Sequence, residues 1–144
     1  RRHSPYGLAG NLNDVVELLR SEPHSRQAYL PIFFPEDTGA VHGGRIPCTL
    51  GYHFLLRNDR LHLWYEIRSC DAIRHFRDDV YLAVRLQLWM LEQLQQIQFG
   101  RVYDAHEVLT VEKWNNVRPG NFYFLAHSFH AHMGDIHYLK ATHQ

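Results

Sequence analysis

The sequence predicts an α/β (α+β) fold in which a mostly antiparallel or mixed sheet packs against one long central helix. Two β-rich runs, at 48–56 and 61–70, flank the polar segment Arg57-Asn58-Asp59-Arg60, which suits a hairpin turn. Downstream, apolar residues recur at near-helical spacing from 77 to 98. A hairpin followed by a helix of this length indicates a sheet with one face covered by that helix.

Length and composition indicate one ordinary globular domain. A chain of 144 residues is one domain by length. We therefore expect a single domain over residues 1–144, which could be incomplete at both ends because the sequence opens on Arg1-Arg2-His3 without an initiating methionine. Fifteen basic residues balance fifteen acidic ones, which argues against a nucleic-acid binder. With two cysteines, no secretory signal and no apolar run near about 18 residues, we expect a cytoplasmic protein that does not bind membranes.

Two elements are predicted ahead of the hairpin. Residues 11–20 have the apolar pattern of an amphipathic helix, and Asn11 or Asn13 can cap it. Residues 28–34 form an aromatic and β-branched run typical of a strand, where Pro31 indicates a sheet edge or a bulge.

The last element is a predicted strand over residues 119–132. Strand alternation places His130 and His132 on one face with Ser128, and His127 on the other. Histidine clusters can hold a metal ion. Because His127 faces away and no carboxylate stands nearby at ligand spacing, we expect no metal site here.

Cys48 follows Pro47 and opens the first strand of the hairpin. Only the thiolate is a good nucleophile, so a reactive cysteine needs partial exposure and positive neighbours, for which Arg26, Arg45 and Arg68 are candidates. The alternative is that Cys48 is a small buried apolar residue, as many free cysteines are.

The hairpin geometry groups further polar residues with Cys48. Antiparallel partners equidistant from a turn lie opposite one another. Arg68, Ser69 and Asp71 can therefore share a cleft with Cys48. Solvated charges at a strand end are the alternative for Asp71.

Short motifs along the chain point to a family. In order, the chain contains Ser25-Arg26, Pro47-Cys48, Arg68-Ser69-Cys70-Asp71, Pro119-Gly120 and His130. Over residues 6–132 the sequence thus resembles the thymidylate synthases, where "SRR", "PC", "RSxD" and "PG…F…H-x-Y" segments occur in this order. That family also includes nucleotide hydroxymethylases.

The resemblance implies the reaction and its central residues. Cys48 would be the catalytic nucleophile that adds to C6 of a pyrimidine nucleoside monophosphate, after which C5 takes the one-carbon unit of 5,10-methylenetetrahydrofolate. Arg68 would bind phosphate and face the thiol, and Ser69 would contact the nucleotide. Asp71, as a catalytic residue, would support the folate ring, near which His75 stands where the family has a glycine.

Further residues are assigned by the same resemblance. Arg26 would reach the phosphate of the other subunit in a homodimer with a shared phosphate site, although Gln27 replaces the second arginine of the motif. His130 and His132 would hold the ribose 3′-hydroxyl, with His132 standing in for a tyrosine. The segment 134–137 imitates the family's "GDxH" but lies too far from Pro119-Gly120, so we interpret it as an accidental match.

Asp79 aligns with the asparagine by which thymidylate synthases recognise the pyrimidine ring, and an aspartate there is associated with cytosine. An ionised carboxylate can accept a hydrogen bond from the cytosine amino group, which uracil lacks. The neighbouring Asp78 complicates the assignment, and a carboxylate near a helix N-terminus is often only a favourable charge at the helix dipole.

The sequence therefore predicts a one-carbon transferase, most simply a hydroxymethylase of (d)CMP. The alternatives are a thymidylate synthase or hydroxymethylase acting on dUMP, and a catalytically degenerate homologue that binds nucleotides without turnover. Thr49 and Ile67 depart from the family's histidine and glutamine. The retained Cys48, Arg68 and Asp71 favour an enzyme, whereas the family's general-base glutamate and C-terminal segment have no visible counterpart, which favours the last alternative.

Overall fold

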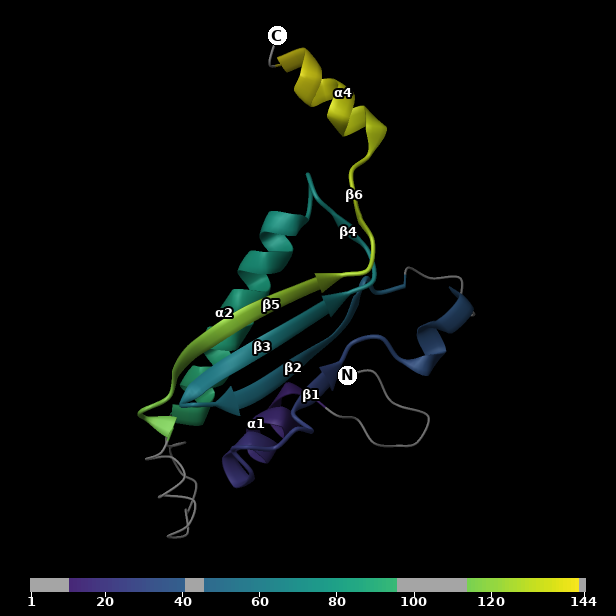
Figure 1. Ribbon diagram of the computed structural model, residues 1–144. Helices are drawn as coiled ribbons and strands as arrows, with labels where there is room; N and C mark the ends of the chain where they lie inside the picture. Colours follow the sequence, from purple (N-terminus) through teal and green to yellow (C-terminus); the bar gives the residue numbers. More distant parts are fainter. Residues whose placement is uncertain (1–10, 41–45, 96–113, 143–144) are drawn as a thin grey trace.

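The computed structural model describes residues 11–40, 46–95 and 114–142. Its centre is a four-stranded sheet in the order β1-β2-β3-β5 (Figure 1). The strands are β1 (Tyr29–Pro31), β2 (Thr49–Arg57), β3 (Arg60–Ile67) and β5 (Arg118–Ala126). β1, β2 and β3 pair antiparallel, and β3 pairs parallel with β5, so the predicted mixed sheet is confirmed.

A two-residue turn joins β2 to β3. Asn58 and Asp59 have φ values of 51° and 53°, as a type I′ turn requires, and Arg57 pairs with Arg60. At the far end of the hairpin the register shifts between Thr49 and Gly51, and Thr49 pairs with Ile67. The predicted hairpin is confirmed.

The helices flank this sheet. α1 (Leu12–Ser21) begins with a capping box, in which Asn11 accepts from the backbone of Asn13 and Asp14 and the Asp14 carboxylate accepts from Asn11 N at 2.7 Å. α2 (Phe76–Gln95) crosses behind the sheet in Figure 1. Both predicted helices are confirmed, and predicted helix residues 96–98 lie outside the described residues.

The core lies between α2 and one face of the sheet. Among its fully buried side chains are Phe54, Leu61, Leu63, Met90, Leu94 and Trp114. Gln87, also buried, donates from Nε2 to the carbonyl of Leu61 at 2.7 Å and so ties α2 to β3. Burial of this apolar surface is the main term that stabilises the fold.

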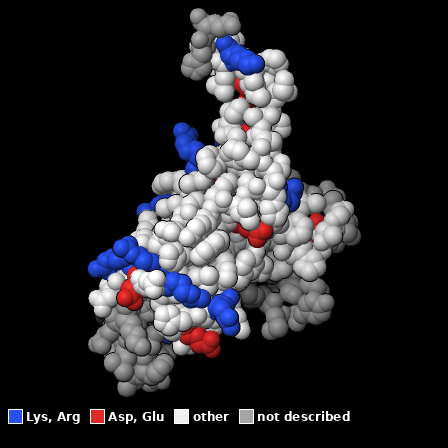
Figure 2. Space-filling model, in the orientation of Figure 1, with Lys and Arg blue, Asp and Glu red and all other residues white. Residues whose placement is uncertain are grey.

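The other face of the sheet has no covering helix among the described residues and is rich in aromatic rings. Trp64 stacks on Tyr123 with ring centroids 4.3 Å apart, and Tyr29 meets His53 edge-on at 5.8 Å. Tyr29, Trp64 and Tyr123 remain between 36% and 40% exposed. This face is turned to the viewer in Figures 1 and 2, and its central part is mostly uncharged. We call it the aromatic face.

The predicted strands 61–70 and 119–132 are each wrong in one respect, since both break in two. β3 ends at Ile67, and Cys70–Asp71 forms β4, which pairs parallel with β6 (Phe129–His130). The reason is that the chain passes the start of its partner strand β2 at Thr49 and finds new backbone acceptors along the segment that contains β6. Cys70 N donates to Ser128 O at 2.8 Å, and Ala72 N donates to His130 O at 2.7 Å.

Beyond β6, the chain continues as α4 (Met133–Thr142), which extends away from the sheet and has no buried residue (Figure 1). A short 3-10 helix, η1 (Pro35–Ala40), occupies part of the predicted loop before β2. None of the described helices has the length and apolar character needed to cross a membrane.

Candidate active site

Cys48 lies at the start of β2 and is exposed. The Arg68 guanidinium donates from Nε to Pro47 O at 2.9 Å and from Nη2 to Ile46 O at 3.2 Å, so it holds the two residues that precede the cysteine. The Arg68 backbone N also donates to Cys48 O at 2.8 Å. The structure therefore brings the predicted nucleophile and the predicted phosphate ligand together, and the interpretation of Cys48 as a buried apolar residue is wrong.

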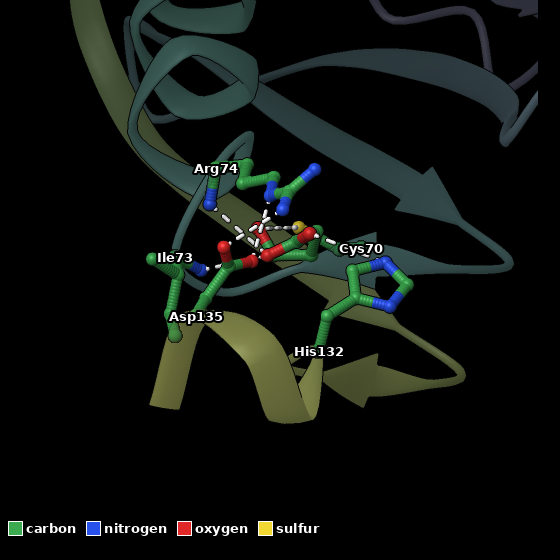
Figure 3. A network of polar contacts seen from close by, with 6 residues as sticks. Cys70, Ile73, Arg74, His132 and Asp135 are labelled. Carbon is green, nitrogen blue, oxygen red and sulfur yellow. Dashed lines mark hydrogen bonds and ion pairs between the residues drawn. The ribbon is translucent and has the colours of Figure 1, made fainter. Parts of the chain in front are cut away.

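Asp71 follows in β4 and is 5% exposed. Its Oδ1 accepts from the backbone N–H of Ile73 at 2.9 Å and of Arg74 at 3.0 Å, which fixes the carboxylate in an Asx-type turn (Figure 3). The hydrogen bond from Arg74 N lowers the pKa of Asp71 most, and the Ile73 N–H and the charge of His132 add to this. Asp71 is therefore an ionised carboxylate, held by the backbone, and not a loosely solvated charge.

The parallel pairing of β4 with β6 places His130 beside Asp71, since these two residues are register partners. His132 Nε2 lies 3.5 Å from Asp71 Oδ2, and the rings of His130 and His132 meet edge-on with centroids 5.4 Å apart. His127 instead contacts Glu66 of β3 at 2.9 Å. The predicted pairing of His130 with His132, away from His127, is thus confirmed, whereas the expectation that no carboxylate stands nearby is wrong.

Asp79 lies in the first turn of α2 and contacts Cys70, whose thiol donates to Asp79 Oδ2 across 3.6 Å. Burial raises the pKa of the Cys70 thiol to about 11, and the charge of Asp79 and this hydrogen bond add to the rise. Asp71 and Cys48 contribute smaller electrostatic effects to the same thiol. Asp79 is therefore joined to the other residues through Cys70.

We refer to these residues together as the strand-end cluster, which comprises Cys48, Arg68, Cys70, Asp71, Asp79, His130 and His132. Ser69 is half-buried between two of its members, and His75 is exposed just before α2. Thr49, next to the nucleophile, shares a 3.0 Å hydrogen bond with the Tyr65 hydroxyl. This contact gives the threonine a partner in the core, because Tyr65 is buried.

Arg26 is not brought to the cluster within one chain. It is exposed, and its carbonyl contacts His53 Nε2 at 3.1 Å, near the middle of β2. His53 is five residues from Cys48, or about 16 Å along a strand. Arg26 therefore borders the aromatic face and not the strand-end cluster.

Sequence reasoning missed one ion pair at the edge of the cluster. Arg74 donates from Nε and Nη2 to the two oxygens of Asp135 at 2.6 and 2.7 Å, which joins the turn after β4 to the start of α4 (Figure 3). The segment 134–137 was interpreted as an accidental match, and its Asp135 has this structural role instead. The signal that the sequence offers is the place of Asp135 in the first turn of α4, where an acidic side chain is favoured by the helix dipole.

Comparison with known proteins identifies the fold. No protein-family model matches the sequence, and no curated protein gives a significant match. Among solved structures, the chain is similar to a thermostable thymidylate synthase A from Bacillus subtilis, with a TM-score of 0.61 and 17% sequence identity over 97% of this chain. The match spans 42% of that structure. The chain therefore has a thymidylate-synthase-like fold, as the order of its motifs predicts.

Proposed function

We propose that this protein modifies C5 of a pyrimidine nucleotide with a one-carbon unit, and that its preferred substrate is a cytidine monophosphate, which it hydroxymethylates. The observation that carries the proposal is the placement of exposed Cys48 next to the guanidinium of Arg68, on a thymidylate-synthase-like fold. Arg68 uses two N–H groups on the backbone before Cys48, and the guanidinium has three more donors for a phosphate.

In the proposed reaction, the Cys48 thiolate forms a bond from Sγ to C6 of the pyrimidine. The electron pair of the C5–C6 double bond moves into the ring, so that C5 becomes a carbon nucleophile. Once C5 carries the one-carbon unit, it loses its hydrogen as a proton. The bond from that carbon to the folate nitrogen would break, with tetrahydrofolate as the leaving group, and water would add its hydroxyl to the same carbon. Breaking the Sγ–C6 bond then restores the C5–C6 double bond and releases the thiolate. This chain's part in these steps is to supply the thiol, to hold the phosphate with Arg68 and to orient the sugar with His130 and His132.

The cofactor that suits this chemistry is 5,10-methylenetetrahydrofolate, which would supply the one-carbon unit. A test of fit is the buried carboxylate of Asp71, whose Oδ1 is occupied by two backbone N–H groups. Its Oδ2 lies 3.5 Å from His132 Nε2 and, with two lone pairs, can accept a further hydrogen bond, which fits a folate ring that presents N–H donors. His75, exposed beside it, would border the same ring.

The choice of cytosine rests on Asp79. The Cys70 thiol donates to one of its oxygens and so orients the carboxylate. Its second oxygen would accept from the N4 amino group of cytosine. Uracil has the O4 carbonyl at that position, which is itself an acceptor and cannot donate to the carboxylate.

We further propose a homodimer formed through the aromatic face. This face presents partly exposed aromatic rings beside the polar pair of Glu66 and His127, and Arg26 borders it, so a second copy packed on it would receive that arginine near its own phosphate site. Trp64→Arg should then give a monomer in light scattering at micromolar concentration, while the parent is a dimer. Tyr81→Arg, at an exposed aromatic residue of α2, is the matched control and should stay dimeric. A parent chain that is monomeric at this concentration contradicts the proposal.

The decisive experiment is tritium release from 5-tritiated CMP, dCMP, UMP and dUMP in the presence of methylenetetrahydrofolate. We expect release with the cytosine nucleotides, because C5 must lose its hydrogen as it gains carbon. Nucleotide binding without release from any of the four would instead identify a non-catalytic nucleotide-binding protein.

A further inference from the structure

Three potential metal ligands meet at the parallel junction of β4 and β6. Asp71, His130 and His132 each offer one ligand atom, and these atoms all lie within 4.8 Å of one another. Asp71 and His130 are paired across the two strands, and His132 follows two residues later on the same side. Among the described residues, this group combines two imidazoles with one carboxylate.

The distances suit a single small cation. A tetrahedral zinc ion with bonds near 2.0 to 2.1 Å places its ligand atoms roughly 3.3 Å apart. His132 Nε2 and Asp71 Oδ2 are already 3.5 Å apart. The ligand atom of His130 lies within 4.8 Å of the other two, and the exposed ring of His132 has room to rotate toward it.

The surroundings hold the carboxylate ready as a ligand. Asp71 is 5% exposed, and its Oδ1 is fixed by the backbone of Ile73 and Arg74, so that Oδ2 alone faces the histidines. Such outer hydrogen bonds orient a metal ligand and sharpen its affinity. The cationic Arg74 is bound along one edge of its guanidinium by both oxygens of Asp135, which offsets its charge near the site.

We propose that Asp71, His130 and His132 bind a divalent cation of the zinc class. Two imidazoles and one carboxylate suit Zn²⁺, Co²⁺ or Ni²⁺ better than Ca²⁺ or Mg²⁺, which prefer oxygen ligands. Three protein ligands leave at least one coordination position for water or for an oxygen of a bound molecule. Because the ion would take Asp71 Oδ2 and both histidines, these atoms could not at the same time make the sugar and folate contacts proposed for them.

The test is calorimetric titration of the chelator-treated full chain with Zn²⁺ alone, with Co²⁺ absorption as a second readout. We expect one saturable site. Asp71→Asn should weaken it by at least roughly 100-fold, since loss of a direct ligand exceeds the effect of losing an outer hydrogen bond. Asparagine keeps the carbonyl oxygen that accepts from Ile73 and Arg74, so the turn and the fold are retained. Circular dichroism checks this.

Two further variants make the result specific. His127→Ala removes an exposed imidazole from the link between β5 and β6, where His127 contacts Glu66 and not the proposed ligands, and should bind Zn²⁺ as the parent does. His132→Tyr should lose the site while it keeps a hydroxyl for the sugar. Absence of a saturable site in the parent overturns the proposal, as does equal affinity in the parent, Asp71→Asn and His132→Tyr.

The metal site shares residues with the proposed function but does not rest on the transfer reaction. The titrations contain neither nucleotide nor folate, so a chain without tritium release can still show the site. Conversely, an active chain without a Zn²⁺ site retains the proposed function and loses only the metal site.

Discussion

The two cysteines of this chain lie near the same end of the sheet, in very different surroundings. Cys48 is exposed just before β2, and Arg68 donates to the carbonyls of the two residues that precede it in the chain. Cys70 is 1% exposed in β4, and its thiol donates to Asp79. The comparison teaches that access and local charge divide two cysteines at one end of a sheet: Cys48 is open to a substrate, whereas Cys70 is buried and faces a carboxylate, which disfavours its thiolate.

The largest expected effect is on turnover, which should require Cys48 but not Cys70. Cys48→Ser should lower tritium release by on the order of 1,000-fold or more, because a hydroxyl at neutral pH is a far weaker nucleophile than a thiolate. Nucleotide binding, measured by calorimetry, should persist because the change is nearly isosteric.

Cys70→Ser is the matched control for this prediction. A serine can still donate to Asp79, so turnover should stay within about tenfold of the parent. Release at the parental rate by Cys48→Ser would show that Cys48 is not the nucleophile.

A smaller but still large effect concerns alkylation. With its pKa raised to about 11 from 9.0, Cys70 holds roughly 100-fold less thiolate at pH 8 than an ordinary thiol, and its burial blocks access as well. Iodoacetamide at pH 8 should therefore label Cys48 alone, as read by mass spectrometry of peptides. Labelling of both cysteines at similar rates would contradict the structural difference between them.

The carboxylate beside Cys70 gives the third prediction. Asp79→Asn should shift preference from cytosine toward uracil by about one to two decades in relative kcat/KM, since a mismatched buried hydrogen bond costs on the order of 1 to 3 kcal/mol. Competition between CMP-type and UMP-type nucleotides measures this.

Asp78→Asn is the control for that competition, because Asp78 belongs to the same helical turn and has an exposed side chain. An unchanged preference in Asp79→Asn would move base recognition elsewhere and favour thymidylate-type methylation.

The surroundings of the two cysteines also differ in how far they could be predicted from the sequence. The hairpin and both long helices follow from local signals: Asn58-Asp59 at the turn, the Asn11 cap and the apolar spacing of α2. The parallel pairing of β4 with β6 has no local signal, because its backbone hydrogen bonds join Asp71 to His130, which lies 59 residues further along the chain. For this reason the carboxylate beside the histidines could not be expected from residue spacing, whereas Cys48 and Arg68, linked by one hairpin, could.

The smallest effect is on stability at alkaline pH. The folded-state pKa of Cys70, about 11, lies above the 9.0 of an ordinary thiol, so the unfolded chain loses this proton first as pH rises. The stability that the protonated thiol contributes is therefore complete below about pH 9 and is lost between pH 9 and 11.

The test compares urea midpoints at pH 8 and pH 10.5 under reducing conditions. From the lower to the higher pH, the midpoint should fall more for the parent than for Cys70→Ser, whose hydroxyl does not titrate there. Burial also raises the pKa of Tyr52 and Tyr65, but both tyrosines are present in the two proteins, so their effect cancels in the difference. Parallel losses of midpoint in parent and variant would mean that the Cys70 proton does not contribute to folding.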